Sequence, residues 1–71
     1  MVNKYEIILW WEEEDDCYIA EVPELPGCMA HGDTEERALK EIKIAIGLWI
    51  ETAEANKETI PKPKGKKLIY A

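Results

Sequence analysis

The stretch CYIAEVPELPGCMAHGDT, residues 17–34, decides the fold, because it holds two strand-like segments, the rigid turn between them and a helix start. Residues 17–22 alternate between an apolar set and a set that ends in Glu21, which is the period of a strand. The turn over residues 23–27, PELPG, cannot continue a sheet, because each proline lacks an amide donor and the glycine admits a positive φ. We therefore predict strands over residues 17–22 and 28–31, joined by a tight crossing.

The end of this stretch, Gly32-Asp33-Thr34, has the composition of a helix start. Either Asp33 or Thr34 can accept hydrogen bonds from the free amides of the first turn. If Asp33 is the cap, Glu36 completes a capping box, and acidic residues in the first turn suit the positive end of the helix dipole. We predict that the helix runs from here to near Asn56.

The predicted helix has one broad apolar face and one narrow apolar ridge on the opposite side. At about 100° per residue, the broad face spans an arc of about 140°, which is wide enough to cover a sheet. Ile44, Leu48 and Ala55 form the ridge, between charged residues. Because these apolar side chains have no packing partner in a monomer, we predict that Ile44 and Leu48 mediate self-association. The broad face consists of Ala38, Leu39, Ile42, Ala45, Ile46, Trp49, Ile50 and Ala53.

Upstream of the quoted stretch, residues 4–12 alternate again and predict a first strand. Residues 12–16, EEEDD, carry charges that repel one another and need water, so the chain turns there and the two strands form a hairpin. One set of alternate residues from the two strands is expected to face the core. That set is Tyr5, Ile7, Leu9, Trp11, Tyr18, Ala20 and Val22.

The predicted order is β-β-β-α-β, an α+β fold with a three-stranded antiparallel meander and one long helix packed on one face. A right-handed crossover after the helix would lay a fourth strand, Lys67 to Tyr70, beside the first strand and parallel to it. A single helix leaves the other sheet face open, and exposed apolar patches of this sort usually mark contacts with other chains. The residues predicted to bind a partner are Ile8, Trp10, Glu12, Glu13, Ile19 and Glu21.

The length and the net charge of the chain limit the partners and the oligomeric states that we expect for it. The 71 residues make one domain, 1–71, near the size at which a single core supplies only about 3–5 kcal/mol of net stability, so we expect a homodimer or homotetramer. The net charge of -6 repels phosphates and disfavours direct DNA or RNA binding, whereas it attracts a basic protein. The sequence has neither an apolar run of membrane-spanning length nor a signal peptide's start, so we expect a cytoplasmic protein without membrane contact.

Candidate catalytic and metal-binding groups are few. Residues 12–16 lack the glycine and the alternate ligand positions of a calcium loop, which favours a solvated hairpin tip. His31 is the single histidine and has no nucleophile arrangement beside it. Cys17 and Cys28 are too few and too widely spaced for a zinc knuckle or a redox pair, so we predict buried free thiols. We expect no catalytic residue, no cofactor and no metal.

Two motifs, YIAEVPELPGC at residues 18–28 and GDTEERAL at residues 32–39, resemble the HicB-like antitoxin family. The family pattern is a strand ending in aromatic-x-Ala-Glu, a Leu-Pro-Gly-Cys turn, a Gly-Asp-Thr helix entry, a long helix and an Ile-Pro-x-Pro exit. Each element stands here in that order, the last one at residues 60–63, so the resemblance covers nearly the whole chain.

The resemblance implies a partial ribonuclease-H-like fold with the same β-β-β-α-β order. It also implies a non-catalytic antitoxin of a type II toxin-antitoxin system, which binds a HicA-like toxin, a small basic protein that cleaves messenger RNA. Complete HicB antitoxins often carry a C-terminal DNA-binding domain, and since this chain ends at Ala71 we expect no direct operator contact. Ribonuclease H enzymes need carboxylates on the first strand, where this chain has Ile7, Ile8 and Leu9 at the centre.

Two alternatives stay open at this point. The first is an orphan homo-oligomeric domain, which would serve a structural or regulatory role without a toxin. The second is a metal-dependent nuclease, for which Glu6 and Glu36 are the nearest available acids.

Overall fold

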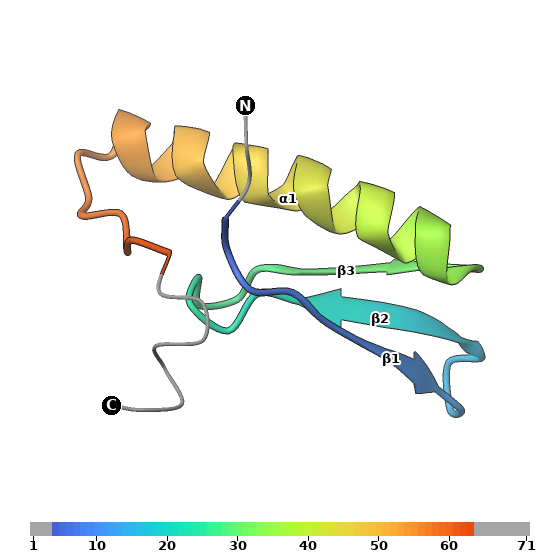
Figure 1. Ribbon diagram of the computed structural model, residues 1–71. Coiled ribbons are helices and arrows are strands. Elements are labelled where there is room, and N and C mark those ends of the chain that lie inside the picture. Colours follow the sequence, from blue (N-terminus) through green and yellow to red (C-terminus); the bar gives the residue numbers. More distant parts are fainter. Residues whose placement is uncertain (1–3, 64–71) are drawn as a thin grey trace, which may run out of the picture.

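Three strands and one helix build the domain in the order β1 (Ile8–Glu12), β2 (Cys17–Glu21), β3 (Met29–Gly32) and α1 (Glu35–Ala55). The structure, a computed structural model, describes residues 4–63. The strands form an antiparallel sheet in the order β1-β2-β3, and α1 lies across one face of it (Figure 1). This arrangement confirms the predicted α+β class and meander. The predicted fourth strand, residues 67–70, lies outside the described residues.

The strand register fixes which side chains share a face. Ile8 pairs with Glu21, and Trp10 pairs with Ile19, in the antiparallel ladder of β1 and β2. Since directly opposite residues point to the same side of a sheet, these four side chains lie on one face. Ala20 pairs with Ala30 of β3 and belongs to the other face, toward α1. The alternation read from the sequence therefore gave the correct parity for both strands of the hairpin.

The sheet begins later in the chain than predicted, because β1 starts at Ile8 and not at Lys4. Residues 5–7 still contribute to the fold: Tyr5 and Ile7 are half-buried against the core, and the backbone amide of Glu6 donates to Glu24 Oε1 at 3.0 Å. The hydroxyl of Tyr5 also donates to the carbonyl of Pro61. These contacts join the start of β1 to the loop before β3 and to the chain that follows α1.

The turn after β2 is held by its own backbone and by a buried leucine. Val22 N donates to Cys28 O at 3.0 Å, Leu25 N donates to Val22 O at 3.1 Å, and Cys28 N donates to Leu25 O at 3.0 Å. Gly27 has a φ of 79°, which glycine adopts without steric cost. Leu25 is fully buried, so the turn is part of the core, a role that the sequence pattern did not reveal.

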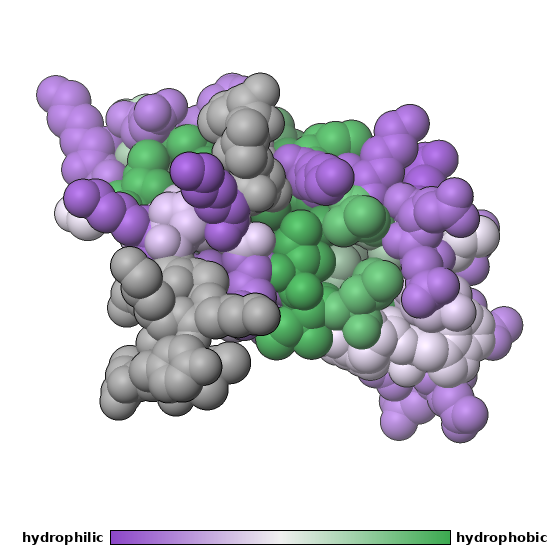
Figure 2. Space-filling model, in the orientation of Figure 1, coloured by the Kyte–Doolittle hydropathy of each residue, from purple (hydrophilic) through white to green (hydrophobic). Residues whose placement is uncertain are grey.

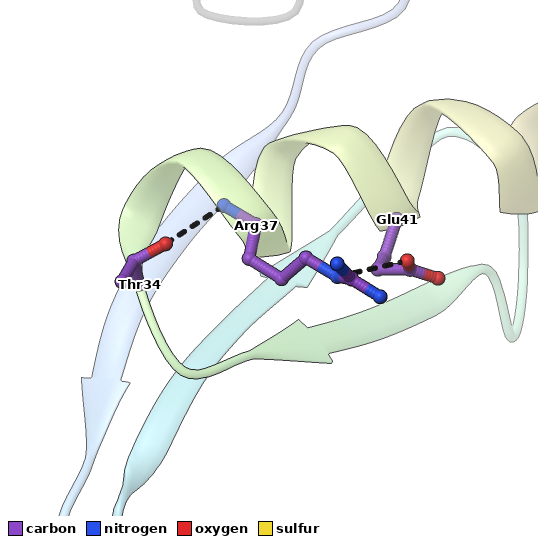
Figure 3. Close-up of polar contacts among 3 residues, drawn as sticks. All are labelled: Thr34, Arg37 and Glu41. Atoms are coloured by element: carbon purple, nitrogen blue, oxygen red, sulfur yellow. Dashed lines mark hydrogen bonds and ion pairs between the residues drawn. The ribbon is translucent and has the colours of Figure 1, made fainter.

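Thr34, and not Asp33, caps α1. Its side-chain oxygen accepts a hydrogen bond from the amide of Arg37 at 3.0 Å (Figure 3). Glu35 and Glu36 occupy the first turn of the helix. At the other end, Lys57 has a φ of 57° and its amide donates to Glu54 O. The predicted end near Asn56 is confirmed, because Asn56 is the C-cap.

The core lies between α1 and the helix-facing side of the sheet. The side chains of α1 that are buried there, Ala38, Ile42, Ile46 and Ala53, all belong to the predicted broad face. The remaining members of the buried cluster come from β2 and from the turn and start of β3. They are Ala20, Val22, Leu25 and Cys28. No helix among the described residues is long and apolar enough to cross a membrane.

The prediction that Trp11 is buried in the core is wrong, because its side chain is 44% exposed. Trp11 has the predicted parity and packs edge-on against Tyr18, with 5.0 Å between ring centroids. However, α1 contacts β3 most extensively and β1 least, so the helix-facing side of β1 is only partly covered. Leu39, from the predicted broad face of α1, is 37% exposed.

Candidate functional site

The sheet face opposite α1 gathers most of the residues that the sequence predicted for partner binding. We call the set Ile8, Trp10, Glu12, Ile19 and Glu21 the open face. All five lie on neighbouring positions of β1 and β2 in the observed register, and no described helix covers them (Figure 1). Their side chains combine three apolar groups with two carboxylates, a composition suited to a protein partner with apolar and basic groups.

Trp10 lies at the middle of the open face and is held in position. Its ring nitrogen donates to Glu12 Oε1 at 3.3 Å, and its Cα partner across the ladder is Ile19. Both Trp10 and Ile19 are half-buried, so they expose less surface than the sequence pattern suggested. Ile8 is 45% exposed. A tryptophan that is already ordered loses little conformational freedom on binding, which suits it to be an anchor residue.

The structure adds Met29 to this surface. It lies opposite Glu21 in the ladder of β2 and β3 and is 51% exposed. His31 lies opposite Ile19 on the same face and is also exposed. The sequence held a signal for both, because alternation from the helix-facing Ala30 places residues 29 and 31 on the other side. We therefore extend the candidate surface onto β3.

The connection between β1 and β2 carries the acidic tip of the hairpin, residues 12–16. Glu13 lies in this turn and is exposed, as predicted, and Asp16 adopts a positive φ of 52°. Cys17 follows directly and is buried. Burial raises the pKa of its thiol, and the carboxylates of Asp15 and Asp33 raise it further. The tip therefore produces a strongly negative electrostatic potential at one end of the open face.

Metal-ligating and thiol side chains are the remaining candidates for chemistry. In residues 4–63, no three His, Cys, Asp or Glu side chains are arranged to hold a metal ion. The thiols of Cys17 and Cys28 are free and buried, which confirms the prediction made from their spacing. Burial also raises the pKa of Cys28, so this thiol keeps its proton at neutral pH.

A second candidate surface lies between α1 and the outer edge of β3. Two shallow depressions share Met29, Ala45 and Leu48 and so form one continuous groove, which we call the β3 groove. Ile44 is 51% exposed and Leu48 is 58% exposed, which places the predicted self-association residues along it. Arg37 Nε lies 3.1 Å from Glu41 Oε2 on the same side of the helix, above β3 (Figure 3).

An apolar surface is also visible between α1 and β1, bounded by hydrophilic side chains (Figure 2). On the helix-facing side of the molecule, Trp11 is 44% exposed and Leu39 is 37% exposed. Exposed apolar area of this kind adds to the surface available for a neighbouring segment or chain.

The fold and its surfaces define a small α+β domain with one sheet face that is both apolar and acidic. The sequence matches the family described as the HicB-like antitoxin of bacterial toxin-antitoxin systems, over residues 5–69. The chain belongs to this family, which confirms the resemblance drawn from its motifs.

Several curated relatives carry the name UPF0150 protein. One from Thermoplasma acidophilum is 38% identical over 65 residues, which cover 92% of this chain and 93% of the relative. Two from Synechocystis are 43% identical over 44 residues and 42% identical over 55 residues, which cover 62% and 78% of this chain and 60% and 70% of the relatives. No solved structure matches the chain significantly.

Proposed function

We propose that this domain is the antitoxin that neutralises a HicA-like, mRNA-cleaving toxin by direct protein binding, in a type II toxin-antitoxin system. Family membership supports the antitoxin role in general. The observation that carries the specific proposal is the open face, where Trp10 and Ile19 stand beside Glu12 and next to the acidic tip. A basic toxin whose RNA-binding surface is apolar and cationic fits this combination.

Charge favours such a partner over nucleic acid. The chain carries 15 acidic against 9 basic residues, and five of the acids are consecutive at residues 12–16. This field speeds the encounter with a cationic protein and opposes the approach of phosphates. We therefore propose a non-catalytic role, without a cofactor, in which the domain covers the toxin's RNA-binding surface and does not touch RNA or DNA itself. We also propose that the domain has the partial ribonuclease-H-like fold that the family resemblance implies.

The first experiment is co-expression with a HicA-like toxin, a small basic protein. A tagged antitoxin is expected to co-purify with that protein and to restore growth that the protein alone arrests. Trp10→Asp places a charge at the centre of the open face and is expected to abolish both effects. Leu48→Asp is the matched control, since it adds the same charge to an exposed site on the opposite side of the sheet. Equal loss in the two variants would contradict the assigned surface.

A second experiment tests the role of the acidic tip. Glu13 and Glu14 lie in an exposed turn, so the double change to lysine is expected to leave the fold intact. It reverses the field near the open face and should slow association with the toxin about tenfold or more at low salt, with a smaller effect at high salt. An association rate that is insensitive to both charge reversal and salt would show that the tip lies outside the encounter surface.

A further inference from the structure

The outer edge of β3 has little protection against pairing with another strand. Met29–Gly32 contains no Lys, Asp, Glu or Pro, which are the residues that edge strands commonly use to prevent such pairing. Within residues 4–63, no strand lies beside β3 on this side. The other outer strand, β1, ends in Glu12 and leads directly into the acidic tip.

The hydrogen-bond pattern shows which backbone groups face this edge. Val22 N donates to Cys28 O, so residues 22 and 28 form a hydrogen-bonded pair. Such pairs alternate with non-bonded pairs along an antiparallel ladder. Ala20 and Ala30 are therefore hydrogen-bonded to each other within the sheet. The amides and carbonyls of Met29 and His31 point away from β2, toward the free edge.

We infer that β3 pairs antiparallel with β3 of a second copy of this chain, about a two-fold axis beside Ala30. In this register, Met29 of each copy lies opposite His31 of the other, and each such pair exchanges two backbone hydrogen bonds. The outward groups of the four-residue strand are then all paired, and the two sheets join into one of six strands. The contact uses the same surface on both copies, which is the usual form of a two-fold interface.

The position of α1 fits this arrangement. Ala20 of β2 is fully buried, whereas Ala30 of β3 is only half-buried and lines the depression at the outer edge, so the helix axis is displaced from β3 toward β2. With strands about 4.8 Å apart, a displacement of half a strand spacing in each copy places the two helices about 10 Å apart, within or near the usual packing range of 8–10 Å. The facing sides of the two helices then carry Ile44 and Leu48. These side chains are exposed in one chain and would be buried between the helices of the dimer.

The charges around the groove favour a second copy of the chain as the occupant of this site. Arg37 and Glu41, which line the groove, already form an ion pair with 3.1 Å between Nε and Oε2. The acidic tip lies at the connection of β1 and β2, and β1 is the strand farthest from β3. Two copies can therefore meet at β3 while their most negative segments stay on the outer sides of the joined sheet.

The test is the mass and the amide exchange of the full chain without any toxin, so its result is independent of the proposed antitoxin function. Sedimentation is expected to give twice the 8.2 kDa mass of one chain. The amides of Met29 and His31 are expected to exchange slowly in the dimer. Leu48→Asp should return the protein to a folded monomer in which these two amides exchange at least tenfold faster.

His31→Pro provides a backbone-specific variant, since it removes an outward amide at an edge position where proline is tolerated. It should give a monomer with an unchanged circular dichroism spectrum, whereas Trp10→Asp, on the opposite face from α1, should leave the dimer intact. A chain that is monomeric at NMR concentrations would overturn the inference. A dimer in which the amides of Met29 and His31 exchange freely would overturn it as well, because the contact would then lie elsewhere.

Discussion

The two faces of the sheet differ in the size of their side chains. On the face toward α1, β2 and β3 present Ala20, Ala30 and Gly32, so the helix backbone can approach the sheet closely. On the open face, β1 and β2 present Ile8, Trp10 and Ile19 in the same register. Toward β1, the helix-facing side also carries the larger Leu9 and Tyr18, which are only partly buried, so the small residues are confined to the part of this face nearest α1. The small residues therefore mark where the helix lies closest to the sheet.

The largest effect is expected where α1 meets the small-residue face. Ile42 is fully buried, and Ile42→Ala removes its packing and leaves a cavity, so the free energy of unfolding should fall by about 2–5 kcal/mol. Lys43→Ala, at the neighbouring exposed position of the same helix, should change it by no more than about 0.5 kcal/mol. Urea unfolding followed by circular dichroism measures both. Similar losses in the two variants would contradict the assignment of Ile42 to the core and of Lys43 to the exposed side of α1.

Gly32 tests the requirement for a small residue directly. A Cβ at this position would lie 2.5 Å from Ala38 N and 2.8 Å from the backbone carbon of Arg37, so strand and helix would have to separate. Gly32→Ala should therefore lower the free energy of unfolding by about 1–3 kcal/mol. Gly47→Ala is the matched control, because nothing lies within 4 Å of the new atom and alanine favours a helix, so it should stabilise by about 0.5–1 kcal/mol. Gly32→Ala with no loss would contradict the close approach.

Thr34 holds the start of α1 over the end of β3. Thr34→Ala removes the acceptor for the amide of Arg37, which should lower the free energy of unfolding by about 1 kcal/mol. Thr34→Ser keeps the hydroxyl and should stay within a few tenths of a kcal/mol of the parent. Chemical denaturation of the three proteins in parallel compares them. If serine and alanine were equally destabilising, the hydroxyl would not be the cause.

The smallest effect concerns the two thiols, which lie on opposite faces of the sheet. Burial raises the pKa of both Cys28 and Cys17 above the ordinary value of 9.0. The folded state therefore keeps thiol protons that the unfolded state loses, so stability is unchanged below about pH 8.5 and falls as the pH rises further. Unfolding followed from pH 7 to pH 10 measures the slope. Cys28→Ala should make the slope shallower, and an unaltered slope would assign the decline to other groups such as Tyr5, whose pKa burial also raises.

Much of this fold follows from residue alternation and helical periodicity. The parity of β1 and β2 and the buried side of α1 depend on local patterns, and the sequence predicted both. The ridge of Ile44 and Leu48 was predicted in the same way, because a helix face is set by residue spacing alone. The choice of Thr34 over Asp33 as the cap was left open by the sequence, since both side chains have the required acceptor.

The error at Trp11 comes from the position of α1 across the sheet. Parity places Trp11 on the helix side but does not say how far the helix extends over β1, so its exposure was not predicted. Leu25 was missed because a loop between two prolines gives no period from which burial can be inferred. Met29 could have been added to the open face by extending the alternation to β3, since it lies directly opposite Glu21. How α1 lies across the sheet is a tertiary property that short-range patterns do not encode.

The most direct test of the antitoxin proposal is amide exchange in the complex with the basic toxin, compared with the free protein at the same concentration. The account predicts new protection over residues 8–21, which include β1, the acidic tip and β2, with little change over the ridge of α1 near Leu48. Protection confined to α1, with exchange at residues 8–21 unchanged, would contradict the claim that the open face is the toxin-binding surface.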